Sequence, residues 1–360
     1  MLDDQVGYIS FTTFNDKAAT EVKQAYDELK AEGMEKLIID VRSNGGGLLN
    51  EAVRIVNYFI PKDNIVVTTK GKKEKWSDTY TTRTNPIDLE MPLAILIDDR
   101  SASASEILAG ALQDYDRAIV VGQRSFGKGL VQRYRELSYG TQMKVTISKY
   151  YTPSGRCIQE LDYTNRDEEG NVPKFSDYGR KEYTTQNGRV VYGGGGILPD
   201  IAIDKTTTTE TTKVLLESDG LFNYATNFFY QNERIADPEN FKLNDGNYKD
   251  LKNYLAAHQS TFKTTAEELL EDATEAARND NLHTGLDKNY KTMLSAIHRE
   301  KLTELDKNKQ EILDDLTEEI VKRYYYAEGV YRQKVAFDEV IKKAWTTLKN
   351  EKAYNDLLNK

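Results

Sequence analysis

Two sequence patterns meet near residue 205 and divide this chain of 360 residues. Before that point, short β-branched and apolar runs alternate with stretches whose apolar residues recur at helical spacing, which is typical of an α/β architecture. After a threonine-rich linker at 206–212, Lys, Glu, Asp, Leu and Ala dominate, and positions such as Ile312 and Ile320 keep helical spacing. We therefore predict an α/β domain over 1–205 and an α-helical domain over 206–360.

The first domain contains several runs that predict individual strands and helices. A polar, glycine-rich stretch at 162–196 indicates hairpins and loops. The capping residues Asn15 and Asp16, the stop at Gly33 and the break at Pro61 set helix limits. Strands are expected at 6–11, 37–41, 93–97, 118–121 and 142–151, and helices at about 17–32, 49–59 and 101–112.

Length and charge narrow the classes of function. A chain of 360 residues exceeds the usual size of one hydrophobic core, and 39% hydrophobic residues describe a globular protein. The net charge is −9, and Lys and Arg are interspersed with acidic residues along the chain. Because the sequence has no continuous basic stripe that would release counterions from nucleic acid, we expect no nucleic-acid partner.

Cysteine and histidine usage argues against a metal site. Cys157 is the one cysteine, which excludes an internal disulfide framework and a multi-cysteine metal site. His258, His283 and His298 show no paired spacing typical of metal ligands. We expect no metal and no cofactor.

Targeting signals are equally sparse. No apolar run approaches the roughly 20 residues that a membrane-spanning helix needs, so we expect no membrane span in this chain. The first eight residues lack the charged-then-apolar layout of a signal peptide. The strand-like pattern begins almost at once, at Val6, which leaves room for domains upstream of Met1.

The distribution of histidines disfavours a Ser-His-Asp triad. All of them fall in the helical part, whereas the glycine-rich turns lie in the α/β part. A serine can instead be activated by a lysine whose ammonium is destabilised by burial. Lys128 lies between Gly127 and Gly129, shortly after an apolar run that ends at Val121. The alternative is an ordinary exposed loop lysine.

Serine candidates open the third predicted helix. Ser101, Ser103 and Ser105 alternate with alanine, which leaves space for a substrate backbone. The amides and partial positive charge of a helix N-terminus stabilise a developing oxyanion. The structural alternative is that one of the three serves only as a helix cap.

Glycine-rich segments offer two further interpretations. The turn 44–47 presents backbone N–H groups that donate to an oxyanion or a phosphate, or that simply make a tight turn. The segment 122–128 has the spacing of a phosphate-binding loop, but Gly129 stands where a magnesium-binding Ser or Thr is required. Nucleotide binding is therefore disfavoured.

Taken together, four motifs resemble the carboxy-terminal processing (tail-specific) proteases. These are Asp-Val-Arg-Ser-Asn-Gly-Gly-Gly at 40–47, Ser-Ala-Ser-Ala-Ser-Glu-Ile at 101–107, Phe-Gly-Lys-Gly-Leu-Val-Gln at 126–132 and Gly-Gly-Ile-Leu-Pro-Asp at 195–200. The resemblance covers about residues 5–204, and Gly45 departs from the proline that many relatives carry. It implies a crotonase-like core of repeated ββα units.

The resemblance also implies roles for individual residues. The serine nucleophile is Ser103, Lys128 is its general base, and Gln132 positions the lysine. The oxyanion would be held by the amides of Gly46 and Ala104, with Glu106 and Asp114 as supporting residues.

Partners and location follow from the same resemblance. Substrates are expected to be proteins or peptides with apolar C-termini, selected in the family by a PDZ domain that precedes this core and is absent from this chain. The expected location is the bacterial periplasm or cell envelope. The helical domain is expected to bind an adaptor, to self-associate, to cover the active site, or to be a packed appendage.

Two other classes of function stay open. A non-catalytic peptide-binding or scaffold protein can keep this fold, and a crotonase-type acyl-coenzyme A enzyme shares its oxyanion-hole architecture. Labelling by a serine-reactive probe would distinguish the first from a peptidase. Coenzyme A binding would identify the second.

Overall fold

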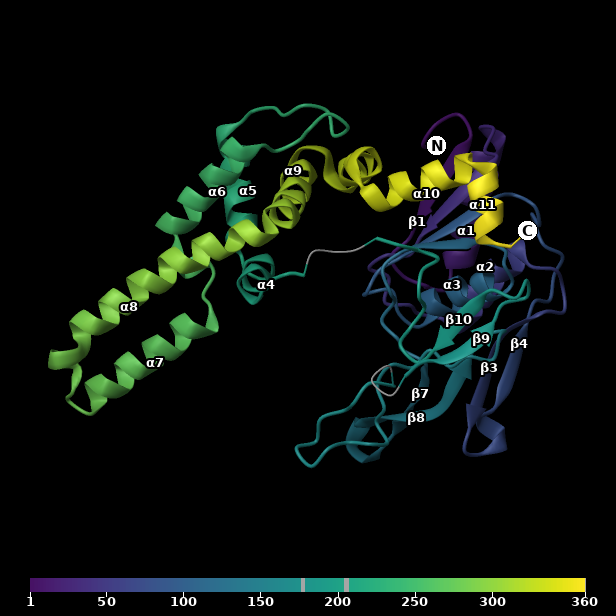
Figure 1. Cartoon of the computed structure of the whole chain (residues 1–360), viewed down its shortest axis with the longest axis horizontal. Coiled ribbons are helices and arrows are strands. Elements are labelled where there is room, and N and C mark those ends of the chain that lie inside the picture. The colour runs from purple at the N-terminus through teal and green to yellow at the C-terminus, as the bar shows by residue number, and fades with distance from the viewer. Residues whose placement is uncertain (176–178, 204–206, 360) are drawn as a thin grey trace. The chain divides into compact units, whose positions relative to one another are not determined.

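The chain folds into two compact units (Figure 1). The computed structural model describes residues 1–175, 179–203 and 207–359. One unit comprises Met1–Asp204 with Glu339–Lys360, and the other comprises Lys205–Asp338. The α/β pattern followed by a helical pattern, predicted from the sequence, is confirmed in this order.

The C-terminal helices differ from the predicted domain limits. We expected a helical domain over 206–360, but α10 (Glu339–Lys349) and α11 (Glu351–Leu357) belong to the first unit. Tyr354 of α11 is buried, and its hydroxyl accepts a hydrogen bond of 3.0 Å from the amide of Leu93. The helical pattern is the same on both sides of Asp338, so periodicity alone gives no sign of this return.

The centre of the first unit is a parallel sheet in the strand order β1-β2-β5-β6-β11. Helix α2 packs against α1 and α3, whereas α10 packs on β2, β5 and β6. Every residue of β5 is buried, as expected for a parallel strand covered on both faces. The strands are β1 (Val6–Ser10), β2 (Lys36–Asp40), β5 (Leu93–Ile97), β6 (Ile119–Gly122) and β11 (Ile201–Ala202). The helices are α1 (Ala18–Ala31), α2 (Leu49–Phe59) and α3 (Ala104–Asp114).

A second, antiparallel sheet has the strand order β4-β3-β8-β7. The strands of this sheet are β3 (Ile65–Gly71), β4 (Asp78–Thr81), β7 (Leu130–Glu136) and β8 (Gln142–Tyr151). Of these four strands, only β8 was predicted from the sequence. The stretch predicted as hairpin and loop contains the hairpin of β9 (Lys181–Thr184) and β10 (Val190–Gly193).

The second unit is helical and has its own core. Leu251, Leu255, Ile312, Leu316 and Ile320 are fully buried in it. Its helices are α4 (Glu210–Glu217), α5 (Gly220–Gln231), α6 (Asp245–Ala257), α7 (Thr265–Asn279), α8 (His283–Glu304) and α9 (Lys309–Phe337). Across the described residues of both units, no helix combines the length and apolarity needed to cross a membrane.

Candidate active site

Sheet topology brings the predicted motifs to one place. Strands β2, β5 and β6 are parallel neighbours, so their carboxyl ends lie at the same edge of the sheet. The glycine-rich turn follows β2, the serine motif follows β5, and the lysine loop follows β6. This edge is where parallel α/β sheets place ligands. Three segments far apart in the sequence therefore meet because their strands are adjacent.

Hydrogen bonds join these three loops directly. The carbonyl of Asn44 accepts from the amide of Ala102 at 3.1 Å and from the hydroxyl of Ser105 at 2.8 Å. On the other side, the amide of Phe126 donates to the carbonyl of Ser101 at 3.0 Å. The serine motif is thus held between the glycine turn and the lysine loop.

The three serines of the motif have different environments. Ser101 and Ser105 are fully buried, and their hydroxyls donate at 2.8 Å to the carbonyls of Val41 and Asn44. Ser103 is partly exposed, and it forms a capping box with Glu106 at the start of α3. Burial therefore separates two structural serines from one that is open to a substrate.

The backbone of Ser103 is strained. Its φ of 59° and ψ of −111° lie in a region that residues with a Cβ rarely adopt. Ser103 precedes the first helical residue, Ala104, although the sequence predicted a helix from Ser101. A serine held on a strained turn between a strand and a helix is the arrangement that exposes the nucleophile of α/β-hydrolases.

One buried carboxylate connects the serine to the lysine. Glu106 is fully buried, and its Oε2 accepts from the amide of Ser103 at 2.8 Å and from the amide of Lys128 at 2.9 Å. Its Oε1 accepts from the hydroxyl of Ser125 at 2.6 Å and from the amide of Gly127 at 2.7 Å. Two amides that reach one oxygen atom are neighbours, so the backbones of Ser103 and Lys128 lie side by side.

Burial also affects the ionisation of Glu106. Desolvation raises the pKa of its carboxyl group, and the hydrogen bonds from Ser125, Lys128, Ser103 and Gly127 oppose this effect. These donors satisfy an otherwise costly buried group. Glu106 therefore fixes the two loops relative to each other.

A tyrosine joins the same two loops through their carbonyls. Tyr150 of β8 is 2% exposed, and its hydroxyl contacts the carbonyl oxygens of Lys128 and, at 3.3 Å, of Ser103. Burial raises the pKa of this phenol well above its usual range, which keeps its proton available for donation. Glu106 and Tyr150 therefore clamp the backbones of both residues from two sides.

Lys128 itself is partly buried and sits in a loop that is tightly packed. A Cβ on Gly127 would lie 2.6 Å from the Cβ of Glu160, and one on Gly129 would lie 2.8 Å from the amide nitrogen of Gln159. Among the residues that the structure describes, the Lys128 amine forms neither a hydrogen bond nor an ion pair.

The predicted oxyanion donors differ in their availability. The amide of Ala104 opens α3 and has no acceptor within the described residues. The amide of Gly46, in contrast, donates to the side-chain oxygen of Asn44 at 2.9 Å. Gly46 has a φ of 95°, and a Cβ there would lie 2.6 to 2.9 Å from Ala102, Ser103 and Ala104. Its lack of a side chain lets the turn approach the serine.

Gln132 lies on the second sheet and is exposed. Its side chain donates to the hydroxyl of Thr146 at 3.4 Å, across the β7 and β8 pair. The register of the β7 and β8 pair shifts between Val131 and Gln132, so Thr146 is separated from Tyr150 by a β-bulge. Thr146 lies about 13 Å from Tyr150 along the strand. Within the described residues, Gln132 forms no hydrogen bond with Lys128.

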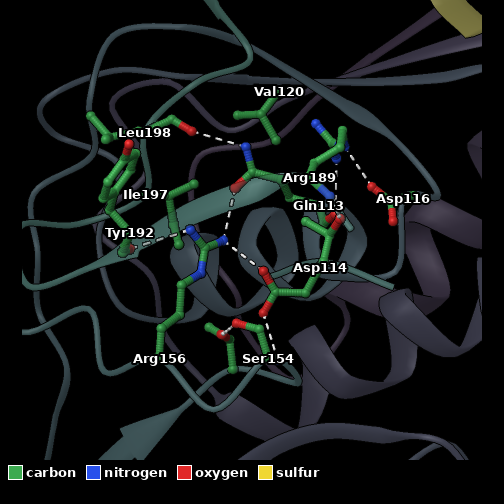
Figure 2. A network of polar contacts seen from close by, with 12 residues as sticks. Gln113, Asp114, Asp116, Val120, Ser154, Arg156, Arg189, Tyr192, Ile197 and Leu198 are labelled. Atoms are coloured by element: carbon green, nitrogen blue, oxygen red, sulfur yellow. Dashed lines mark hydrogen bonds and ion pairs between the residues drawn. The ribbon is translucent and has the colours of Figure 1, made fainter. Parts of the chain in front are cut away.

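Asp114 lies at the opposite end of α3, about 15 Å from its start. Figure 2 shows its carboxylate paired with Arg156. This ion pair is 2.8 Å long, and both side chains are completely buried. The second carboxylate oxygen accepts from the amide of Ser154 at 2.9 Å. Asp114 therefore stabilises the fold at this end and does not touch the serine or the lysine.

The network continues beyond that pair (Figure 2). Gln113 accepts from Arg156 at 2.8 Å and donates to the carbonyl of Leu198 at 2.9 Å. Arg189 bridges Asp116 and Asp200. Burial lowers the pKa of Arg156 and raises that of Asp200, with Asp114 and Arg189 respectively opposing these effects. The closing motif at 195–200 is thus anchored to the end of α3.

Sequence reasoning missed several residues of the site. Asn44, Ser125 and Tyr150 each make buried contacts that hold the loops. Asn44 and Ser125 lie within or beside recognised motifs, so proximity in sequence was a usable signal. Tyr150 appears in the sequence as one aromatic residue of a strand, and only the long-range pairing of β8 reveals its contacts.

Comparison with known proteins supports the resemblance drawn from the motifs. Residues 5–167 match peptidase family S41. Residues 211–348 match the C-terminal helical domain of a probable PDZ-protease. The predicted resemblance to carboxy-terminal processing proteases is therefore confirmed.

Individual relatives agree with this assignment. A C-terminal processing peptidase from the chloroplast of Tetradesmus obliquus is 38% identical over 157 residues, 44% of this chain and 33% of the relative. A probable CtpA-like serine protease of Staphylococcus aureus strain N315 is 41% identical over 158 residues, 43% of this chain and 31% of the relative. The structure of a photosystem II D1 C-terminal processing protease is 30% identical, with a TM-score of 0.42, covering 57% of this chain and 44% of that one.

The chain spans about a third of the length of these two curated relatives. Residues 5–167, which match the peptidase family, contain the serine, glycine and lysine motifs. The relatives are peptidases, which is the class of enzyme predicted from the sequence.

Proposed function

We propose that this chain, which matches peptidase family S41 over residues 5–167, hydrolyses peptide bonds of protein substrates with Ser103 as nucleophile and Lys128 as general base. One observation carries the proposal. Ser103 is the partly exposed serine of its motif, and its amide shares an oxygen of Glu106 with the amide of Lys128. The arrangement supports a serine and a lysine acting together at one edge of the sheet.

The proposed reaction proceeds through an acyl-enzyme. The neutral amine of Lys128 takes the proton of the Ser103 hydroxyl as its oxygen attacks the substrate carbonyl carbon. The resulting ammonium gives that proton to the leaving amine when the peptide bond breaks. Water then attacks the ester with Lys128 again as base, which releases the second product and regenerates the serine.

The oxyanion is proposed to bind near the start of α3. Ala104 supplies one amide donor, assisted by the partial positive charge of the helix N-terminus. Gly46 supplies the second donor if the substrate oxygen replaces the carboxamide of Asn44, which now accepts that N–H. In this proposal Gln132 orients the lysine when a substrate draws β7 toward the site.

The finer parts of the assignment rest on the family resemblance. We propose a crotonase-like core, substrates that are unfolded or have apolar C-termini, and a periplasmic or envelope location. The Staphylococcus aureus relative supports a bacterial location, and the match of 211–348 to the helical domain of a probable PDZ-protease supports the assignment to this type of protease. Self-association or adaptor binding is proposed for the helical domain. Cell fractionation tests the proposed location. The molar mass in solution tests whether the helical domain self-associates.

Hydrolysis of an unstructured polypeptide with an apolar C-terminus tests the proposal. We expect Ser103→Ala and Lys128→Ala each to lower turnover by at least about 10⁴-fold, because both groups take part in the same proton transfer. Lys144→Ala is a matched control, since Lys144 is an exposed lysine of β8, and it should keep full activity. Full activity of Lys128→Ala would contradict the dyad.

The main alternative is a peptide-binding protein without catalysis. It predicts that the wild-type chain binds the same polypeptide and releases it intact. Mass spectrometry of the polypeptide after incubation distinguishes the two functions, because only the peptidase leaves new termini that disappear with Ser103→Ala.

A further inference from the structure

A basic hollow lies on the second sheet of the first unit, outside the serine and lysine site. It has a volume of about 970 Å³. It is formed by two hairpin arms, one running from Lys70 to Trp76 and the other comprising β7 and β8. Among the residues that the structure describes, the arms pair only where Thr68–Gly71 of β3 meets Ser148–Tyr151 of β8. Beyond that point they diverge, and the hollow lies between them.

The hollow is strongly cationic. Seven of its lining residues are Lys or Arg, whereas none is acidic. The acidic residues closest in sequence, Glu74, Asp78 and Glu136, do not line it. The cations are Lys70, Lys72, Lys73 and Lys75 from one arm and Arg133, Arg135 and Lys149 from the other. In a chain whose net charge is −9, this concentration marks a surface complementary to anions.

The floor of the hollow is apolar. Met143, Val145 and Ile147 of β8 line it, as does Trp76 of the other arm. Two cations stack on the indole of Trp76: the amine of Lys75 lies 5.0 Å from the ring centroid and the guanidinium of Arg133 lies 5.1 Å from it. A ligand that matches this surface needs negative charges at its margins and apolar groups toward the floor.

An unpaired strand edge also faces the hollow. Residues 142–146 of β8 pair with β7 on one side, but their other side has no partner strand among the described residues. A Cβ on Gly71 would lie 2.7 Å from the carbonyl oxygen of Ile147, which shows that this edge points toward the β3 arm. Unpaired edges are the sites at which extended peptides add a strand.

The cations, the apolar residues and the free strand edge of the hollow together favour one class of ligand. A bilayer surface does not enter a concave space between two arms, and nucleic acid has no main-chain amides to pair with a strand edge. An extended polypeptide supplies both a backbone ladder and alternating side chains. We propose that the hollow binds an extended acidic segment of a partner protein, which adds as a strand to the free edge of β8.

This proposal does not depend on the peptidase function. Along β8, Val145 lies about 17 Å from Tyr150, which contacts the proposed catalytic pair. Binding is therefore measured with the full chain carrying Ser103→Ala, which leaves the hollow unchanged.

The probe is a fluorescein-labelled peptide of about eight residues in which Glu and Val alternate. Fluorescence anisotropy should show binding that weakens at least roughly tenfold between about 50 mM and about 300 mM NaCl, because exposed charges are screened. The equivalent Lys and Val peptide should not bind. Methylating alternate backbone nitrogens of the acidic peptide should also reduce its affinity roughly tenfold or more, since the ladder is lost.

Variants locate the site. Lys73→Glu with Arg133→Glu should lower the affinity at least roughly tenfold, whereas Lys17→Glu with Lys62→Glu, an exposed pair outside the hollow, should change it less than about twofold. The chain has two tryptophans, so Trp345→Phe leaves Trp76 as the sole indole reporter. Its emission should change on titration with the acidic peptide.

Several results would overturn the proposal. Equal binding of the methylated and unmethylated peptides would show that no strand is added. Tighter binding of a single-stranded oligonucleotide or of anionic phosphatidylserine vesicles than of the peptide would identify a different class of ligand. An unchanged Trp76 emission at saturating peptide would place the binding elsewhere. The peptide comparisons do not depend on whether the charge-reversal variants fold.

Discussion

The two ends of α3 carry buried acidic residues with different roles. At the N-terminal end, Glu106 binds four donors, two of which are the amides of Ser103 and Lys128. At the C-terminal end, Asp114 is closed off in an ion pair with Arg156 (Figure 2). The first arrangement leaves a partly exposed serine beside it, whereas the second leaves no exposed polar group on either side chain. A buried carboxylate therefore positions the serine and lysine loops at one end of α3, whereas at the other end it stabilises the fold.

This contrast explains how a strained serine persists. The unusual backbone of Ser103 costs roughly 1–3 kcal/mol, which other interactions must offset. The network around Asp114, Arg156 and Arg189 fixes the distant end of the same helix and the closing motif. The difference between the ends can be tested by substitutions that separate folding from activity.

The largest effect on stability is expected at the C-terminal end. Arg156→Ala removes the partner of a buried carboxylate and should lower the free energy of unfolding by about 3–5 kcal/mol. Urea unfolding measures the change. Arg124→Ala, which removes a partly exposed partner of Glu160, is the control and should cost less than about 1 kcal/mol. Equal effects would show that burial does not distinguish these pairs.

Gly46→Ala should affect both folding and catalysis. The added Cβ would overlap Ala102, Ser103 and Ala104 at a φ of 95°, so we expect a loss of about 2–4 kcal/mol and at least about 10²-fold lower turnover. Gly45→Ala is the matched control, because a Cβ there meets nothing within 4 Å. If both variants behave alike, the close approach of the turn to Ser103 is not important.

Glu106→Gln tests the positioning end directly. The side-chain nitrogen of the substituted glutamine would face the amides that the carboxylate now accepts from, so we expect a loss of about 1–3 kcal/mol and lower turnover with little change in KM. Since burial raises the pKa of Glu106, the wild type loses stability as the pH rises above about 4.3, the unfolded value. The stability gap between wild type and variant should therefore narrow with rising pH. A gap independent of pH would contradict the raised pKa.

Tyr150→Phe should give the smallest effect. It removes one hydroxyl that contacts the carbonyls of Lys128 and Ser103, which should cost about 1 kcal/mol of stability. Turnover should fall roughly tenfold, with KM nearly unchanged, because the loops are still held by Glu106. Tyr151→Phe, on the opposite face of β8, is the matched control. A decrease in KM alone would exclude a positioning role.

The sequence predicted the local elements and motifs better than their long-range relations. Apolar runs located the central strands, and glycine and serine motifs located the loops that meet at the carboxyl ends of β2, β5 and β6. The β3, β4 and β7 strands were missed, because their polar and charged residues lack a clear alternation. The return of α10 and α11 was missed because helical periodicity does not specify which core a helix joins.

The clustering of charged residues was also not predictable from the sequence, because it depends on long-range contacts. Lys70, Lys73 and Arg133 are distributed among acidic residues in the sequence, which predicted no basic surface. The diverging arms of the second sheet bring them together. Likewise, Glu106 and Tyr150 each contact Lys128, which lies 22 positions away in the sequence from either residue.

The central claim is that Ser103 is the nucleophile and that Lys128 activates it. The most direct measurement is labelling of the full chain with a fluorophosphonate probe, followed by peptide mapping by mass spectrometry. We predict labelling at Ser103, with none at Ser101 or Ser105, and its loss in Lys128→Ala. Labelling of Ser101 or Ser105 instead, or undiminished labelling of Ser103 in the Lys128→Ala variant, would contradict the account.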